Sequence, residues 1–178
     1  VVSVFKPGTQ EELTYNQLGE ICKTGPGNML GYDNPEATAK ALQKHADGNV
    51  WLHTGDLGYM DEDGVLYVLN RGYAPRYGGG DLAVLPMENL VANARIEGID
   101  DEFFVLLDDD EHPGYYLPYL YVVLKDGYTV DSIREKVEEC LEEYQRPVEI
   151  IQIDKRPFFH FKTNRIGLMR ELKAESAS

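Results

Sequence analysis

The chain has 178 residues and a net charge of −14 at neutral pH, and 43% of its residues are apolar. This length suits one full domain or two small lobes, and so acidic a surface repels nucleic-acid phosphates, which argues against general nucleic-acid binding. No apolar run approaches the roughly 18 residues that span a bilayer, so no membrane association is expected.

The first 70 residues alternate short apolar stretches with turns, and they predict a strand-rich lobe. Strands are expected at 1–5, 19–23, 50–53 and 65–69. A single helix should begin after Asn34, a good N-cap followed by Pro35 at the first helical position, and should end just before Gly48. Asp63-Gly64 is a strong hairpin signal between two of the strands.

The pattern changes near Asn70-Arg71-Gly72, after which helices and strands interleave. Helices are expected at 86–94, at 130–144 and from 166 onwards, with strands at 103–107, 117–124 and 148–153. Residues 130–144 place apolar side chains on one face and glutamates on the other. The sequence therefore predicts an α+β protein with two domains, 1–70 and 71–178.

Cysteines, histidines and the acidic run 108–111 give weaker signals. Cys22 and Cys140, the only cysteines, lie far apart without CxxC spacing, which favours reduced thiols in a cytoplasmic protein over a single disulfide. The four histidines have no metal-ligand spacing, so no metal site is expected. The run 108–111 (Asp-Asp-Asp-Glu) predicts a solvated turn, because carboxylates without partners resist burial.

Five short segments between residues 19 and 64 form an ordered set of motifs. Residues 51–59 read Trp-Leu-His-Thr-Gly-Asp-Leu-Gly-Tyr, and Asp-Glu-Asp-Gly follows at 61–64. Upstream, the segments 19–22, 25–32 and 34–38 read Gly-Glu-Ile-Cys, Gly-Pro-Gly-Asn-Met-Leu-Gly-Tyr and Asn-Pro-Glu-Ala-Thr. Together they resemble the C-terminal portion of the AMP-forming acyl-CoA synthetases, members of the adenylate-forming (AMP-binding) ligase superfamily. The resemblance is strong over 19–71 and weaker over 72–178.

The resemblance implies a fold and a nucleotide site. Residues 1–70 would be the β-rich end of the AMP-binding domain, and 71–178 the mobile α+β C-terminal lid domain. Thr54, Asp56 and Arg71 would contact ATP or AMP. A carboxylate can accept hydrogen bonds from both ribose hydroxyls, and Asp56, after a Thr-Gly turn at a strand end, could project into a cleft. The alternatives are that Asp56 caps a turn and that Arg71 forms a surface salt bridge.

Two further sites follow from the family pattern. Gly78, Gly79 and Gly80 match a glycine-bearing loop whose backbone could approach a phosphate or the pantetheine of coenzyme A, although a flexible hinge is equally consistent. The family's catalytic lysine, in a pattern like Thr-x-x-Gly-Lys-Ile, corresponds to Arg165. Lys162 could substitute for it only if the loop is re-threaded. Tyr73 also departs from the family, which commonly has an acid or lysine there.

The implied activity is that of an ATP-dependent acid–thiol ligase. A carboxylic acid and ATP, with magnesium, would form an acyl-adenylate, and the acyl group would pass to coenzyme A. His53 favours acyl-CoA ligases over peptide-synthetase adenylation domains. The phosphate loop, adenine pocket and acid tunnel belong to a region that does not precede Val1, so the isolated chain is expected to be inactive and to bind no nucleotide tightly. The alternative is a ligase-derived module that has lost adenylation and binds a ligand or a partner protein.

Overall fold

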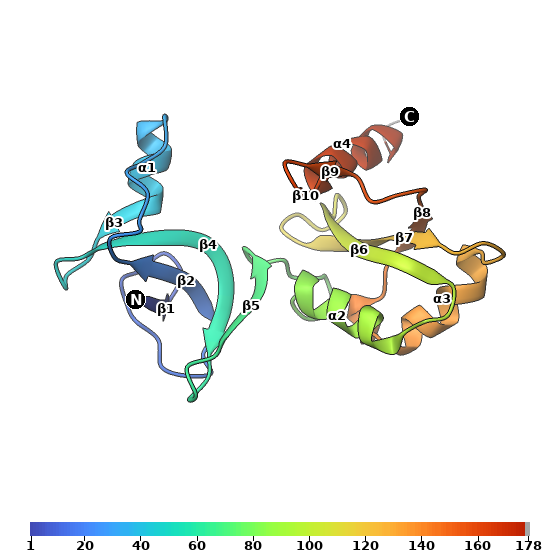
Figure 1. Cartoon of the computed structure of the whole chain (residues 1–178), viewed down its shortest axis with the longest axis horizontal. Helices are drawn as coiled ribbons and strands as arrows, with labels where there is room; N and C mark the ends of the chain where they lie inside the picture. Colours follow the sequence, from blue (N-terminus) through green and yellow to red (C-terminus); the bar gives the residue numbers. More distant parts are fainter. Residues whose placement is uncertain (177–178) are drawn as a thin grey trace. The chain divides into compact units, whose positions relative to one another are not determined.

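The computed structural model describes residues 1–176 of the chain, with side chains up to Ala174 (Figure 1). Two compact units are present, Val1–Tyr73 and a second unit that begins at Ala74. The break in the structure falls after Tyr73, whereas the sequence pattern changes at Asn70. No helix among the described residues is long and apolar enough to cross a membrane.

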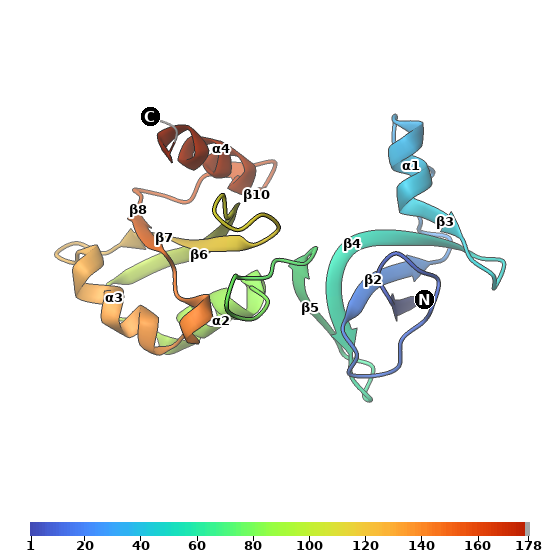
Figure 2. The same cartoon turned by 180° about the vertical axis from the view of Figure 1, so that it is seen from behind.

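The first unit is an antiparallel sheet with one helix. The strands β1 (Val2–Phe5), β2 (Gly19–Thr24), β4 (Val50–Met60) and β3 (Leu42–Lys44) pair in that order, and β5 (Leu66–Arg71) also pairs with β4. The long β4 curves strongly (Figures 1 and 2). Its pairing is irregular opposite Glu20–Cys22 and again at Leu57–Gly58, and such bulges bend a strand. A small core of Phe5, Cys22 and Trp51 packs beside it.

Local sequence signals account for the helix and the hairpin of this unit. The Asn34 side chain accepts hydrogen bonds from the backbone N–H groups of Glu36 and Ala37 at 2.8 and 3.1 Å, and α1 (Pro35–Ala41) follows. The expected extension of this helix towards Gly48 is wrong, because residues 42–44 leave the helix to pair with β4. The hairpin between β4 and β5 is confirmed: Gly64 has a φ of +80°, and its N–H donates to the Asp61 carbonyl.

The second unit is a three-stranded sheet with helices on both faces. The strand order is β6 (Ile99–Asp108), β7 (Tyr116–Leu124), β8 (Glu149–Gln152), with β7 and β8 parallel. The helices α2 (Val84–Ala94) and α3 (Val130–Glu139) cover one face and α4 (Arg165–Ser176) covers the other (Figure 1). Because side chains alternate along β6, Phe104 packs against the first pair of helices and Phe103 packs under α4.

Three details of this unit differ from the sequence analysis. The helix α3 ends at Glu139, and a 3-10 turn (Glu143–Gln145) follows, although Tyr144 still packs against the core. The chain also forms a small hairpin of β9 (Phe158–Phe159) and β10 (Lys162–Thr163). The expectation that all of 108–111 is solvated is wrong for Asp109, which is buried. Its carboxylate accepts from His112 Nδ1 at 2.9 Å and from the Glu111 backbone N–H, so the burial is compensated.

One ion pair anchors the segment between β8 and β9, and with it the hairpin, to β6. The Arg156 guanidinium pairs with the Asp101 carboxylate and donates to the Glu102 carbonyl and the Thr163 hydroxyl. It also lies 4.6 Å from the centre of the Phe103 ring. These contacts hold the pKa of Asp101 below its usual range, chiefly through the hydrogen bond from Arg156.

Candidate functional site

The segment 51–59 lies within β4, and this changes the expected surroundings of Asp56. The prediction that Asp56 follows a turn at a strand end is wrong, since β4 continues from Val50 to Met60. Gly55 adopts a φ of +74°, a conformation that glycine tolerates well, and the strand bends there without ending. Asp56 is half-buried at this bend, in the interior of the strand.

Asp56 and Arg71 lie directly opposite each other on adjacent strands. They are Cα partners in the antiparallel pairing of β4 with β5, so their side chains point to the same face of the sheet. Next to them, the Gly72 N–H donates to the Gly55 carbonyl at 3.0 Å, which closes the end of the ladder. The fold thus brings together a carboxylate and an exposed guanidinium, a pair suited to ribose hydroxyls and phosphate oxygens.

The Thr54 hydroxyl forms hydrogen bonds with backbone groups in this structure. Its hydroxyl donates to the Ile21 carbonyl at 2.6 Å and accepts from the Asp56 N–H at 3.1 Å. The first contact ties β4 to β2, and the second fixes the peptide that carries Asp56. Thr54 is therefore placed to orient Asp56, and a direct contact of its hydroxyl with a nucleotide would have to compete with these two hydrogen bonds.

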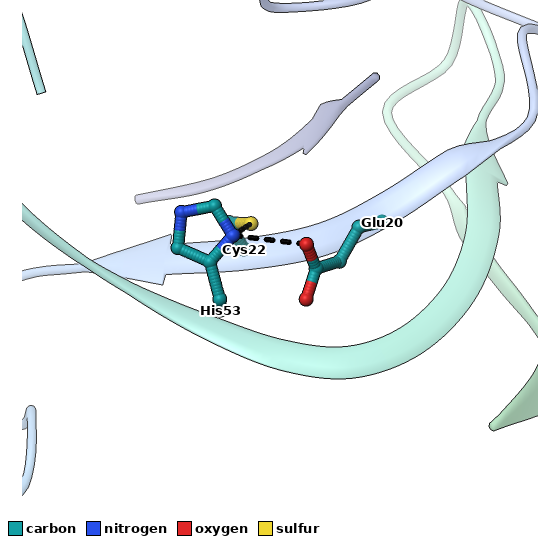
Figure 3. Close-up of side chains that lie close together, drawn as sticks. All are labelled: Glu20, Cys22 and His53. Carbon is teal, nitrogen blue, oxygen red and sulfur yellow. Dashed lines mark hydrogen bonds and ion pairs between the residues drawn. The ribbon is translucent and has the colours of Figure 1, made fainter. Parts of the chain in front are cut away.

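A buried polar cluster lies beside the bend (Figure 3). His53 Nδ1 is 2.9 Å from Glu20 Oε2 and 3.5 Å from Cys22 Sγ. Glu20 Oε1 accepts from the Gly55 N–H at 3.0 Å, and His53 Nε2 lies 2.9 Å from His45 Nε2. The three groups in Figure 3 could hold a metal ion, because one donor atom from each lies within 4.8 Å of the others.

Sequence reasoning did not find this cluster, because no two of its members show metal-ligand spacing. The available signal was the alternation of Glu20 and Cys22 on β2, which places both on one face, but the register that sets Cys22 opposite His53 is a tertiary fact. Burial and the Glu20 carboxylate raise the pKa of the Cys22 thiol to about 12, against a smaller lowering by the Thr54 backbone N–H. Burial and the neighbouring His53 lower the pKa of His45.

A cavity of about 480 Å³ connects the cluster to the candidate nucleotide residues. Its lining includes Glu20, His53, Thr54, Gly55 and Arg71. The cavity therefore exposes the edge of the polar cluster and the base of the Asp56 bend to the same space.

The glycine loop has a packing reason for its composition. A Cβ on Gly79 would lie 2.3 Å from the Tyr144 Cβ, and one on Gly80 would lie 3.0 Å from the Tyr144 Cζ. The Gly79 N–H already donates to the Arg76 carbonyl at 3.1 Å, and Gly78 has a φ of +72°. The loop is thus a hydrogen-bonded turn that packs on Tyr144, and its role towards phosphate or pantetheine stays a prediction.

Arg165 and Lys162 have different surroundings. The Arg165 guanidinium donates through Nε to the Phe104 carbonyl at 3.0 Å and pairs with Glu88 Oε1 at 2.7 Å. Glu88 Oε1 also accepts from the Phe104 N–H at 2.8 Å, so the three groups form one network. Lys162 is exposed on β10. The residue at the expected lysine position therefore holds the start of α4 against β6 and α2.

Sequence comparison relates the chain to CoA ligases. No family model matches the chain. The 4-coumarate–CoA ligase 5 of Oryza sativa subsp. japonica is 35% identical over 161 residues, covering 88% of this chain and 28% of that enzyme. The 2-succinylbenzoate–CoA ligase of Geobacillus sp. (strain WCH70) is 36% identical over 149 residues, covering 78% of this chain and 27% of that enzyme. The chain thus spans little more than a quarter of the length of these relatives.

Solved structures give the same picture of the fold. ATP-bound MatB from Rhodopseudomonas palustris superposes with a TM-score of 0.79 at 23% identity, covering 100% of this chain and 35% of that protein. The o-succinylbenzoate CoA synthetase of Bacillus subtilis, in complex with its acyl-adenylate intermediate, gives a TM-score of 0.75 at 25% identity, covering 94% of this chain and 33% of that protein.

Proposed function

The chain belongs to the adenylate-forming acid–CoA ligases and corresponds to their C-terminal part, and we propose that it contributes Asp56 and Arg71 to the nucleotide site of such a ligase. The carboxylate of an organic acid would attack the α-phosphorus of ATP, releasing pyrophosphate and forming an acyl-adenylate. The thiol of coenzyme A would then displace AMP and form the thioester. Magnesium would accompany ATP, and both steps would need the larger domain that the relatives possess.

The pairing of Asp56 with Arg71 across β4 and β5 is the observation that supports this proposal best. Asp56 would accept hydrogen bonds from the two ribose hydroxyls, and charge-assisted bonds of this kind are the stronger class. Arg71, on the same face, would reach the ribose or phosphate oxygens. Two such contacts contribute only about 1.5–3 kcal/mol each, whereas association costs several kcal/mol, so the isolated chain should bind ATP weakly or not at all.

A chimera tests the proposal directly. This chain would replace the matching C-terminal part of the rice 4-coumarate–CoA ligase, and acid-dependent ATP–pyrophosphate exchange would be measured. We expect exchange in the chimera and a loss of at least about tenfold in the Asp56→Asn variant, because one charged contact is worth about 1.5–3 kcal/mol. The variant Asp61→Asn, a carboxylate in the hairpin turn of the same unit, serves as the matched control. Equal exchange in Asp56→Asn and the parent chimera would contradict the assignment.

A non-catalytic module is the second candidate, and the surroundings of Arg165 favour it. The family's lysine position is occupied here by a guanidinium that two protein groups already engage. If adenylation has been lost, the chimera will fold and bind ATP but show no exchange. The variant Arg165→Lys should then restore exchange in part, whereas a chimera that is active without this change would exclude the second candidate.

A further inference from the structure

We propose that Glu20, Cys22 and His53 form a binding site for a zinc-class divalent cation in the first unit of the chain. The three donors converge from two strands: Glu20 and Cys22 from β2, and His53 from β4 (Figure 3). Their ligand atoms lie within 4.8 Å of one another, close enough for one ion to contact all three after small side-chain adjustments. The proposal does not depend on the proposed ligase activity.

The donor set favours zinc over magnesium or calcium. One imidazole nitrogen, one thiolate sulfur and one carboxylate oxygen are the ligand types found at zinc sites, whereas magnesium and calcium take oxygen ligands. A thiolate and a carboxylate together carry two negative charges, which the charge of a divalent cation balances. This balance matters because Cys22 is fully buried and the side chains of His53 and Glu20 are only 6% and 16% exposed.

Each ligand also has a partner that would hold it in place. Glu20 coordinates through Oε2 while its Oε1 keeps the hydrogen bond from the Gly55 N–H. His53 coordinates through Nδ1 while its Nε2 faces His45 Nε2. A hydrogen bond on the second nitrogen of a metal-bound histidine is the usual arrangement, and losing it typically costs 10–100-fold in affinity. The Thr54 backbone lowers the pKa of the Cys22 thiol in part, which favours its thiolate.

Cation binding rearranges protons in a defined way. The thiol proton of Cys22 leaves to solvent as the sulfur–metal bond forms. His53 must present a lone pair at Nδ1, so its one remaining proton sits on Nε2 and is donated to His45 Nε2, which requires the His45 proton to sit on Nδ1. Without a cation, the favourable arrangement is the reverse: His53 Nδ1–H donates to Glu20, and His45 Nε2–H donates to His53 Nε2. The cavity of about 480 Å³ that Glu20 and His53 line provides an approach path and room for a fourth ligand such as water.

Cobalt titration of the full chain tests the site. An untagged, chelator-stripped sample in a phosphine reductant would receive Co²⁺ under anaerobic conditions. We expect one equivalent of binding, a thiolate-to-cobalt charge-transfer band, and displacement of this band by Zn²⁺. Cys22→Ala should abolish the band, and His45→Gln should weaken binding about 10–100-fold. Cys140→Ala removes the other thiol, which lies in the second unit and bonds to the Val137 carbonyl, and should leave the band unchanged.

Two further readouts keep the result decisive if Cys22→Ala folds poorly. Zn²⁺ should raise the melting temperature of the wild-type chain and of Cys140→Ala, because a ligand of the folded state stabilises it, but should have little effect on Glu20→Gln. Long-range ¹H–¹⁵N spectra should show the His53 proton moving from Nδ1 to Nε2 on zinc addition. No cobalt band in the wild-type chain, a band that survives in Cys22→Ala, or an unchanged His53 tautomer would each overturn the proposal and leave a hydrogen-bonded network.

Discussion

Replacing Arg165 by alanine should destabilise the second unit by about 1–3 kcal/mol. The substitution removes the hydrogen bond to the Phe104 carbonyl and the ion pair with Glu88. Hydrogen bonds to charged groups contribute about 1.5–3 kcal/mol each when buried, but the Arg165 side chain is 36% exposed, so its ion pair belongs nearer the 0–1 kcal/mol of solvated pairs. Arg165→Lys keeps a charge near Glu88 without the forked geometry, and about half of the loss is expected.

Urea unfolding followed by far-ultraviolet circular dichroism and by amide NMR measures this loss. The NMR signals of β6, α2 and α4 report on the second unit, and Trp51, the only tryptophan, reports on the first unit by fluorescence. Lys162→Ala is the matched control, because Lys162 is exposed and surface substitutions usually stay within about 0.5 kcal/mol. A double-mutant cycle of Arg165→Ala with Glu88→Gln should give a coupling energy of at least about 0.5 kcal/mol.

The same substitutions separate a structural role from a catalytic one. If position 165 is the catalytic position, Arg165→Lys should raise pyrophosphate exchange in the chimera, because a compact lysine charge restores part of an electrostatic contribution worth about 10²–10³-fold in rate. Thioester formation from a synthetic acyl-adenylate should change little. An unchanged urea midpoint in Arg165→Ala would refute the network described here. Unchanged exchange in Arg165→Lys, with exchange abolished in Lys162→Ala, would show that Lys162 is the catalytic position.

Two further predictions concern the second unit. Gly79→Ala should lower the free energy of unfolding by about 1–3 kcal/mol, because the added Cβ would lie 2.3 Å from the Tyr144 Cβ. In the same urea assay Gly27→Ala, a control in the first unit whose added Cβ would have no atom within 4 Å, should be near neutral. Asp101 has a lowered pKa, so the stability that it contributes is present above its ordinary pKa of about 3.9 and is lost as the pH falls through the lower folded value. Melting curves should therefore show a melting temperature that falls at acid pH, and Asp101→Asn should make this fall smaller. The same pH profile in the variant as in the wild-type chain would contradict the ion pair.

Features that depend on a few neighbouring residues were predictable from the sequence. Asn34 followed by Pro35 fixed the start of α1, because the cap needs only the next two backbone N–H groups. Asp63-Gly64 gave the hairpin, since the turn requires a positive φ that glycine adopts readily. Where the helix ends was not predictable, because residues 42–44 are drawn into pairing with β4, which is a tertiary effect.

Long-range pairing decides the features that the sequence did not predict. Asp109 carries a charge that favours solvent. Its partners, the His112 ring and the Glu111 backbone N–H, belong to the same turn, so it is the burial of this turn that depends on the fold. The polar cluster arises because β2 and β4 pair with Cys22 opposite His53. Sequence position alone was enough to match Arg165 to the family's lysine. Its contact with Glu88, far away in the sequence, depends on how α4 packs on the sheet.

The bend at Gly55 explains why a short motif can hold one carboxylate in place. Glycine loses more conformational freedom on folding than any other residue, so a fixed positive φ at Gly55 must be stabilised by its surroundings. Here the Gly55 N–H donates to Glu20, its carbonyl accepts from Gly72, and the next N–H, that of Asp56, donates to the Thr54 hydroxyl. Three hydrogen bonds thus fix the peptides on both sides of the bend and place Asp56 opposite Arg71. Glu20 belongs to this arrangement as much as Thr54 does, so a substitution at Glu20 that removes the bond from the Gly55 N–H should disturb the orientation of Asp56 through the backbone.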